Sequence, residues 1–216
     1  KVNFREFDWQ MLRSEHFELY YYPEEEELAR IAIGMAEESY RVHRERFVHE
    51  VEERIPIILY SSQHDFEQTN ITPMLIPEGV AGLTESLRGR VLMPFNGSLT
   101  EFAGTLEHEL VHAFQLSMAR RVYQDRGQSR TLSLPLWFTE GIAEFWSKDW
   151  DTEADMVVKD MVLNGMLFTI PNMYQVNGTF YMYKLGESIC QFIDSTYGSD
   201  KLTLIFENWY KGRTFD

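Results

Sequence analysis

An α+β fold is what this sequence of 216 residues predicts, with a mixed sheet and helices first and a mostly helical part after it. Stretches rich in aromatic and β-branched residues, which favour strands, lie before Gly97. Apolar residues at helical spacing dominate the rest of the chain. Hydrophobic residues make up 44% of the sequence, so there is enough apolar material for a core, and disorder is excluded as the main state.

Four strands are expected in the first part of the chain, each bounded by turn-forming residues. The aromatic run at 15–22 ends at a proline, and the apolar run at 54–60 has the composition of a buried strand. Two shorter strands, at 79–84 and 90–95, flank residues with turn character. Their spacing predicts a hairpin.

A long helix is expected between the first two strands. Proline and acidic side chains at 23–27 suit a first helical turn, and the helix should end near Phe47 or Val48. The later helices are predicted from apolar periodicity and flanking glycines or prolines. They are expected at 100–119, 136–148, 152–163, 183–197 and 200–211.

The whole chain is expected to be one domain, since 216 residues lie within the usual size range. A soft boundary near Gly97 divides it into a sheet-rich lobe, 1–97, and a helical lobe, 98–216. Because the chain begins with Lys1 rather than Met and breaks off at Asp216, we expect it to be a piece of a longer protein.

Charge and cysteine content exclude several classes of function. The net charge of −14 repels nucleic-acid phosphates and anionic lipids, so nucleic acid is not an expected partner. No apolar run approaches the roughly 18 residues of a membrane helix, so no membrane insertion is expected. The single cysteine, Cys190, excludes a thiolate-clustered zinc site and should be a small buried residue. His43 and His49 are expected on a solvated helix face.

The most informative segment is His108-Glu109-Leu110-Val111-His112, an H-E-x-x-H motif on a predicted helix. Residues four apart on a helix point in nearly the same direction, so His108 and His112 can reach one zinc ion. Glu109 lies about 100° further round and can address a water on that ion. The alternative is a pair of surface histidines flanking a glutamate. A metzincin is excluded, because Gln115 and Met118 occupy the glycine and third-histidine positions of that motif.

A catalytic zinc needs a third protein ligand, and no histidine follows His112. The segment Trp-Phe-Thr-Glu-Gly-Ile-Ala-Glu at 137–144 offers two carboxylates four residues apart. We expect Glu140 to bind the zinc and Glu144 to accept a hydrogen bond from the ring N–H of a ligating histidine, His108. The alternative, an acidic surface helix, is disfavoured by the apolar residues around both acids, which predict that they are half-buried.

The motif at 108–112 followed by the segment at 137–144 resembles the gluzincin metallopeptidases, and more closely the peptidase MA-like domains, in which a W-[FL]-x-E-G-x-A-E segment supplies the third ligand. The resemblance implies a thermolysin-like zincin core and hydrolysis of peptide bonds by a zinc-bound water that Glu109 activates. The gap between His112 and Glu140 is longer than in the best-known gluzincins, so residues 120–133 are expected to loop out.

The same resemblance has implications for the cellular setting. Similar bacterial domains often lie at the N-terminus of exported proteins, before a TolB-like β-propeller. We therefore expect an exported protein, periplasmic or extracellular, with a C-terminal β-propeller in the full-length chain. A peptide or protein is the expected substrate.

Two further features of the site are expected. The oxyanion of the transition state needs a hydrogen-bond donor, and the resemblance implies a downstream tyrosine or histidine; Tyr183 is the first choice and Tyr181 the second. The strand that contains Val80, Ala81 and Gly82 is the expected edge that pairs with an extended peptide substrate. Its glycines would let the peptide backbone come close.

Two alternatives to a zinc peptidase stay open. The chain can be a catalytically silent, zinc-stabilised binding or scaffold module of a larger exported protein. It can also be a non-peptidase hydrolase that uses the same zinc-bound water.

Overall fold

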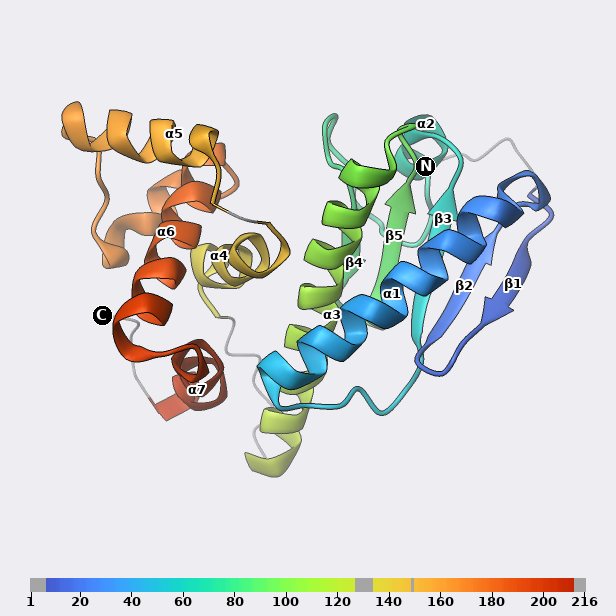
Figure 1. The fold of residues 1–216 in the computed structure, drawn as a ribbon, viewed down its shortest axis with the longest axis horizontal. Coiled ribbons are helices and arrows are strands. Elements are labelled where there is room, and N and C mark those ends of the chain that lie inside the picture. Colours follow the sequence, from blue (N-terminus) through green and yellow to red (C-terminus); the bar gives the residue numbers. More distant parts are fainter. Residues whose placement is uncertain (1–6, 127–133, 149, 212–216) are drawn as a thin grey trace. The chain divides into compact units, whose positions relative to one another are not determined.

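The computed structural model describes residues 7–126, 134–148 and 150–211, and the chain divides into two compact units, Lys1–Ser117 and Met118–Asp216 (Figure 1). A five-stranded mixed sheet lies in the first unit and the second is helical, so the predicted α+β fold is confirmed. The division falls within helix α3 (Leu99–Arg126), whereas the lobe boundary was expected near Gly97. The reason is that the first half of α3 belongs to the core of the sheet unit.

The sheet has the strand order β1-β2-β3-β5-β4. Its three central strands run parallel, and both edge strands are antiparallel to their neighbours. The edge strand β1 was not predicted, because it is short and largely exposed and so lacks an apolar pattern. The strands are β1 (Gln10–Arg13), β2 (Phe17–Tyr21), β3 (Ile55–Tyr60), β4 (Leu83–Glu85) and β5 (Arg90–Pro94).

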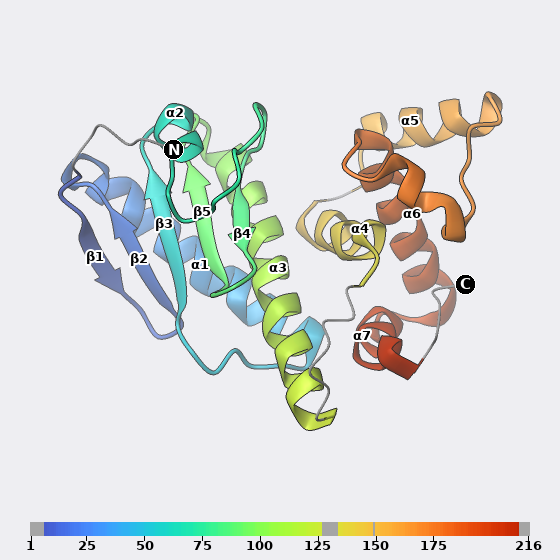
Figure 2. The ribbon, with the colours of Figure 1, turned by 180° about the vertical axis from the view of Figure 1, so that it is seen from behind.

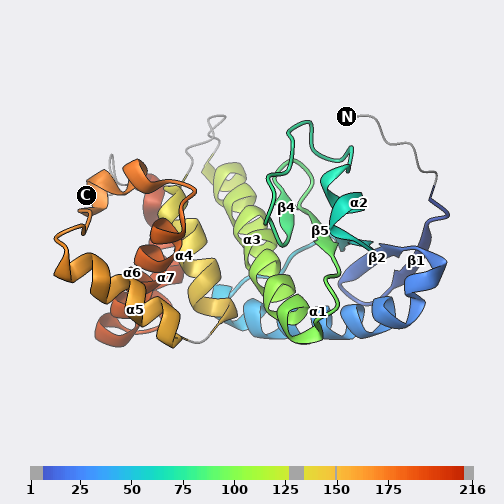
Figure 3. The same ribbon diagram turned by 90° about the horizontal axis from the view of Figure 1, so that it is seen from above.

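One face of the sheet is covered by α1 (Glu26–Phe47), which follows the short helix η1 (Pro23–Glu25), and by the first half of α3 (Figures 1 and 3). Alternate residues of the central strands point to this face, as the pleat of a strand requires. The core residues that they contribute are fully buried: Phe17, Leu19, Ile57, Leu59, Val91 and Met93. Helix α1 ends where predicted, and Val48 caps it in the left-handed conformation with φ of 49°.

The opposite face of the sheet carries α2 (Gln63–Glu67), a short helix that the sequence did not predict (Figure 2). Ser62 caps its N-terminus by accepting a hydrogen bond from the Asp65 N–H. On this face Tyr60, Phe66 and Leu92 are buried in a second apolar cluster.

The second unit consists of α4 (Leu136–Ser147), α5 (Thr152–Leu163), η2 (Ile170–Val176), α6 (Phe180–Tyr197), α7 (Asp200–Asn208) and η3 (Trp209–Lys211). Its central contact is the crossing of α4 and α6 at two glycines. A Cβ atom on Gly141 would lie 2.5 Å from the carbonyl carbon of Gly186, and one on Gly186 would lie 2.3 Å from the Trp137 oxygen. The two helix backbones therefore touch, and no larger residue fits at either position.

Two predicted segments differ from the structure. Residues 120–126, expected to loop out, continue α3 as helix to Arg126, and the rest of that expected loop, 127–133, lies outside the described residues. The strand predicted at 79–84 starts only at Leu83. Gly79 has φ of 86°, which interrupts extended backbone, and Val80, Ala81 and Gly82 precede β4 rather than form it.

Among the helices of the described ranges, none is long and apolar enough to cross a membrane.

Candidate metal centre

The two histidines of the H-E-x-x-H motif face each other on α3. Both side chains are half-buried, and their ring planes meet at 76° with centroids 4.9 Å apart. The Nε2 atoms of His108 and His112 lie 3.2 Å from each other. Two nitrogens bound to one tetrahedral zinc at 2.0–2.1 Å would be about 3.3 Å apart. The pair therefore has the separation that one zinc ion requires.

His112 is oriented by Gln115, one turn further along α3. The Nδ1 atom of His112 lies 2.9 Å from Oε1 of Gln115, and the Gln115 side chain is buried. An amide oxygen can only accept, so we assign the ring proton to Nδ1, which leaves the lone pair of Nε2 for a metal. In the sequence, Gln115 served only to exclude a metzincin, and its contact with His112 was missed. The three-residue spacing of the two on a helix was the available signal.

Glu109 is buried and held by the edge strand of the sheet. The Thr84 hydroxyl oxygen lies 2.7 Å from Oε2 of Glu109 and 2.9 Å from the Glu109 backbone oxygen. The hydroxyl can donate its single proton to either of these oxygens. Gly82 lies so close that an added Cβ would be 2.9 Å from Cγ of Glu109 and 2.8 Å from Cγ2 of Thr105. Gly82 was expected to let a substrate backbone come close, and in the structure its missing side chain also makes room for α3.

The two acids of the predicted third-ligand segment lie on α4. Glu140 is half-buried and Glu144 is buried, as their apolar surroundings predicted. Within the second unit, Glu144 Oε2 accepts a hydrogen bond of 2.8 Å from the Lys184 ammonium group, and Oε1 lies 3.5 Å from Lys148. The sequence predicted a histidine partner for Glu144 and did not foresee these two lysines.

Lys184 on α6 is shared between two carboxylates, those of Glu144 and Glu187, the latter at 3.0 Å. Burial opposes the charge of Lys184, but these two carboxylates outweigh it and raise the pKa of the ammonium group above its ordinary value. Burial also raises the pKa of Glu187, and Lys184 offsets only part of that rise. The result is a buried ionic cluster beside the α4 and α6 crossing.

The tyrosines proposed for the oxyanion both lie in α6. This helix begins at Phe180, before Tyr183, so Tyr183 is inside the first turns rather than at the start. Tyr183 is half-buried, whereas Tyr181 is 44% exposed. The structure thus places Glu140, Glu144 and both tyrosines in the second unit, while His108, Glu109 and His112 lie in the first.

Three residues outside the motif were also assigned from the sequence. Cys190 is buried, as expected, and burial raises the pKa of its thiol far above the usual range. The prediction for His43 and His49 was wrong, because both are buried. His49 Nε2 lies 2.9 Å from the Ser117 hydroxyl, and His43 lies against the ring of Phe114. Burial lowers the pKa of His43 to about 3.

No model of a known protein family matches the chain, and a comparison with curated proteins finds no match either.

Proposed function

We propose that the protein is a zinc-dependent peptidase in which His108, His112 and Glu140 hold the metal and Glu109 is the general base. The observation that carries the proposal is the pair of Nε2 atoms 3.2 Å apart, with His112 oriented by Gln115. Glu140 completes the proposed ligand set as the third ligand that the sequence predicts.

The chemistry of this donor set fits zinc. Two neutral imidazoles and one carboxylate are the ligands of catalytic zinc in several peptidases, and they leave a fourth position open. A site of oxygen ligands alone, which magnesium or calcium prefers, would not use two histidines. When bound, zinc acts as a Lewis acid that lowers the pKa of a coordinated water to roughly 7.

Glu109 takes the proton from the attacking water and delivers it to the leaving amine. The Thr84 hydroxyl fixes the direction of the carboxylate through Oε2, which leaves Oε1 for the proton transfer. Because Gly82 packs against Glu109, the side chain has little room to turn away. Thr84 and Gly82 are therefore positioning residues in this proposal.

Substrate binding is proposed at the outer edge of the sheet. Strand β4 (Leu83–Glu85) is an edge strand, and an extended peptide can pair with such an edge. The predicted contacts at Val80, Ala81 and Gly82 would continue this edge toward the start of the strand. Tyr183, with Tyr181 as the second choice, is proposed to donate a hydrogen bond to the oxyanion.

The decisive test compares Glu109→Gln with the wild type on a broad peptide library after zinc reconstitution. We expect the variant to keep its zinc and to lose hydrolysis by at least about a hundredfold, because a general base contributes roughly 10²–10⁴ in rate. Glu101→Gln, at an exposed glutamate in the first turn of the same helix, is the matched control and should hydrolyse as the wild type does. Equal rates for Glu109→Gln and wild type would exclude the peptidase.

Glu140→Ala and Glu144→Ala separate the roles of the two acids. Loss of a ligand should lower zinc affinity by orders of magnitude, whereas loss of an orienting partner should cost about 10–100-fold. A larger loss for Glu144→Ala, measured by competition with a zinc chelator, would reverse the assignment.

The alternative function is a zinc-stabilised binding module without catalysis. The hydrogen bond from Thr84 and the burial of Glu109 favour it, because a structural glutamate would show both. It predicts that Glu109→Gln changes neither zinc content nor any biological activity. Export of the protein and a C-terminal propeller remain predictions of the family resemblance.

A further inference from the structure

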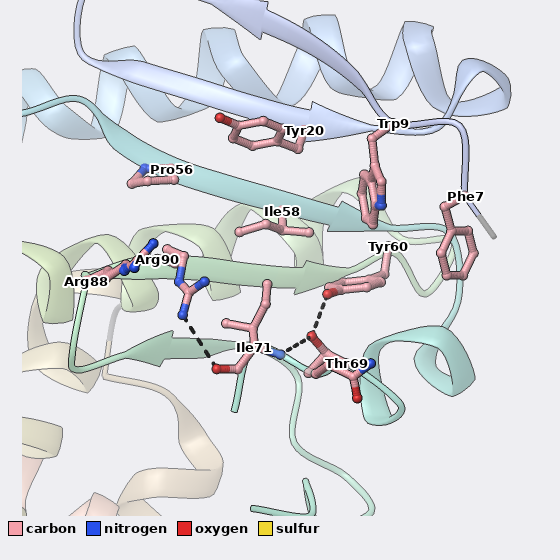
Figure 4. Close-up of a pocket in the computed structure, with 11 residues that line it drawn as sticks. Phe7, Trp9, Tyr20, Pro56, Ile58, Tyr60, Thr69, Ile71, Arg88 and Arg90 are labelled. Atoms are coloured by element: carbon pink, nitrogen blue, oxygen red, sulfur yellow. Dashed lines mark hydrogen bonds between the residues drawn. The ribbon is translucent and has the colours of Figure 1, made fainter. Parts of the chain in front are cut away.

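The first unit contains a hollow of about 610 Å³ on the sheet face opposite α1 and α3 (Figure 4). It shares no residue with the proposed metal centre, so a ligand bound in this hollow would not depend on the proposed function. Its volume lies within the range of about 300–1,000 Å³ that is typical of small-molecule sites.

The floor and one end of the hollow are apolar. Tyr20 of β2 and Ile58 of β3 are paired neighbours in the sheet and form the floor. Figure 4 shows Trp9, Phe7 and Tyr60 together at one end. The Trp9 ring lies 5.9 Å from that of Tyr60, edge-on, and 5.6 Å from that of Phe7. Trp9 remains 40% exposed, so an apolar ligand placed there would remove aromatic surface from water.

The other end of the hollow carries two arginines, Arg88 and Arg90 (Figure 4). Arg90 forms an ion pair with Glu85, and its Nε atom lies 3.0 Å from the carboxylate. Burial opposes the charge of Glu85, but Arg90 and the backbone N–H groups of Leu87 and Arg88 outweigh it and lower the pKa of this carboxyl. Arg90 and Glu85 thus neutralise each other.

Arg88 is different from Arg90. In the part of the chain that the structure describes, its guanidinium group makes no ion pair and no hydrogen bond, and the side chain is exposed. One uncompensated positive charge therefore stands at the polar end of an apolar hollow, in a chain whose net charge is −14. A guanidinium group presents two parallel N–H donors that match the two oxygens of a carboxylate.

We propose that this hollow binds a small amphipathic carboxylate with an aryl or alkyl body. The body lies on Tyr20 and Ile58 and reaches the aromatic end at Trp9, and the carboxylate meets Arg88. A neutral ligand would leave Arg88 without its ion partner, and a cationic one would be repelled by it. A single guanidinium group matches a ligand of a single negative charge.

The test uses three probes with one body and different head groups: 4-phenylbutyrate, 4-phenylbutan-1-ol and 4-phenylbutylamine. Their dissociation constants are measured by calorimetry on the zinc-reconstituted full chain, and NMR of the Trp9 indole and Ile58 methyl signals locates them. We expect the carboxylate to bind about tenfold more tightly than the alcohol, as the gain of a charge-assisted hydrogen bond implies, and the amine to bind most weakly.

The variant Arg88→Gln should reduce the affinity for the carboxylate to that for the alcohol and leave the alcohol unaffected. Arg30→Gln, at an exposed arginine paired with Glu26 on α1, is the control and should change no affinity. Equal binding of the three probes, an unchanged carboxylate affinity in Arg88→Gln, signal changes away from Trp9 and Ile58, or no binding at millimolar probe would each overturn the proposal.

Discussion

The two units hold their proposed site residues by different means. In the first unit, one turn of α3 carries both histidines and the base, so helix geometry alone sets their spacing, and neutral groups on Thr84 and Gln115 fix their directions. In the second unit, Glu144 is held by charge, through Lys184, on a helix whose position depends on the glycine crossing. The geometry of His108, Glu109 and His112 should therefore survive the loss of a single partner. The position of Glu144, in contrast, depends on helix packing and on buried charge.

The most severe loss of stability is expected in the second unit, at the crossing of α4 and α6. Gly186→Ala places a Cβ atom 2.3 Å from the Trp137 oxygen, and a backbone atom cannot move aside without displacing its helix. We expect a loss of more than about 4 kcal/mol in the free energy of unfolding, measured by urea denaturation.

Gly34→Ala in α1 is the matched control, because nothing lies within 4 Å of the added atom there. It should raise stability by about 1 kcal/mol, since alanine favours helix over glycine. If the two substitutions had the same effect, the close crossing would be refuted.

The buried charge of the second unit should matter nearly as much. Lys184→Met leaves Glu144 and Glu187 without their shared buried cation and should destabilise the protein by about 3–5 kcal/mol at neutral pH. Lys148→Met removes a half-exposed lysine 3.5 Å from the same Glu144 and should cost less than about 1 kcal/mol. Similar losses in the two variants would mean that the cluster is not electrostatically important.

The free energy of unfolding should depend on pH through His43, which lies in the first unit. The pKa is about 3 in the folded state against 6.5 for the unfolded reference, so only the unfolded state takes up a proton between these values. Stability is therefore complete above about pH 6.5 and falls as the pH is lowered toward 3. Between pH 7 and pH 5 the loss should be about 2 kcal/mol. Urea denaturation of His43→Leu should lack this component, and an unchanged pH profile would contradict the assignment.

The mildest change is expected at the neutral partner of the metal site. Gln115→Ala should lower zinc affinity by about tenfold, because His112 loses the acceptor that fixes its tautomer. Gln124→Ala, at an exposed position near the end of the same helix, is the control. Chelator competition measures both, and an unaffected affinity in Gln115→Ala would mean that the ring is oriented by other contacts.

Most helices and strands could be predicted, because apolar periodicity and capping residues are local features of the sequence. Helix α5 has the predicted bounds, since Asp151 caps it by accepting a hydrogen bond from Ala154 N–H, and the pattern ends at Leu163. Strand β1 and helix α2 were missed because both are too short for apolar residues to recur at strand or helix spacing. The burial of His43 was missed because it depends on contact with Phe114, which is distant in the sequence.

The residues of the candidate site likewise include some that the local sequence predicts and some that depend on tertiary contacts. His108 and His112 are predictable, because a helix fixes residues four apart whatever surrounds it. Thr84 and Gly82 were not predicted as partners of Glu109, because their approach depends on how the sheet edge packs against α3. Lys184 was missed for the same reason, since only the crossing of α4 and α6 brings it to Glu144.

The zinc content of the protein tests the proposed metal centre most directly. It is determined by mass spectrometry after purification without a metal-binding tag or added metal. We expect about one zinc per chain in the wild type, loss of that zinc in His112→Ala, and full retention in His64→Ala, which removes an exposed histidine outside the site. Absence of zinc from the wild type even after reconstitution, or equal zinc in all three proteins, would contradict the assignment.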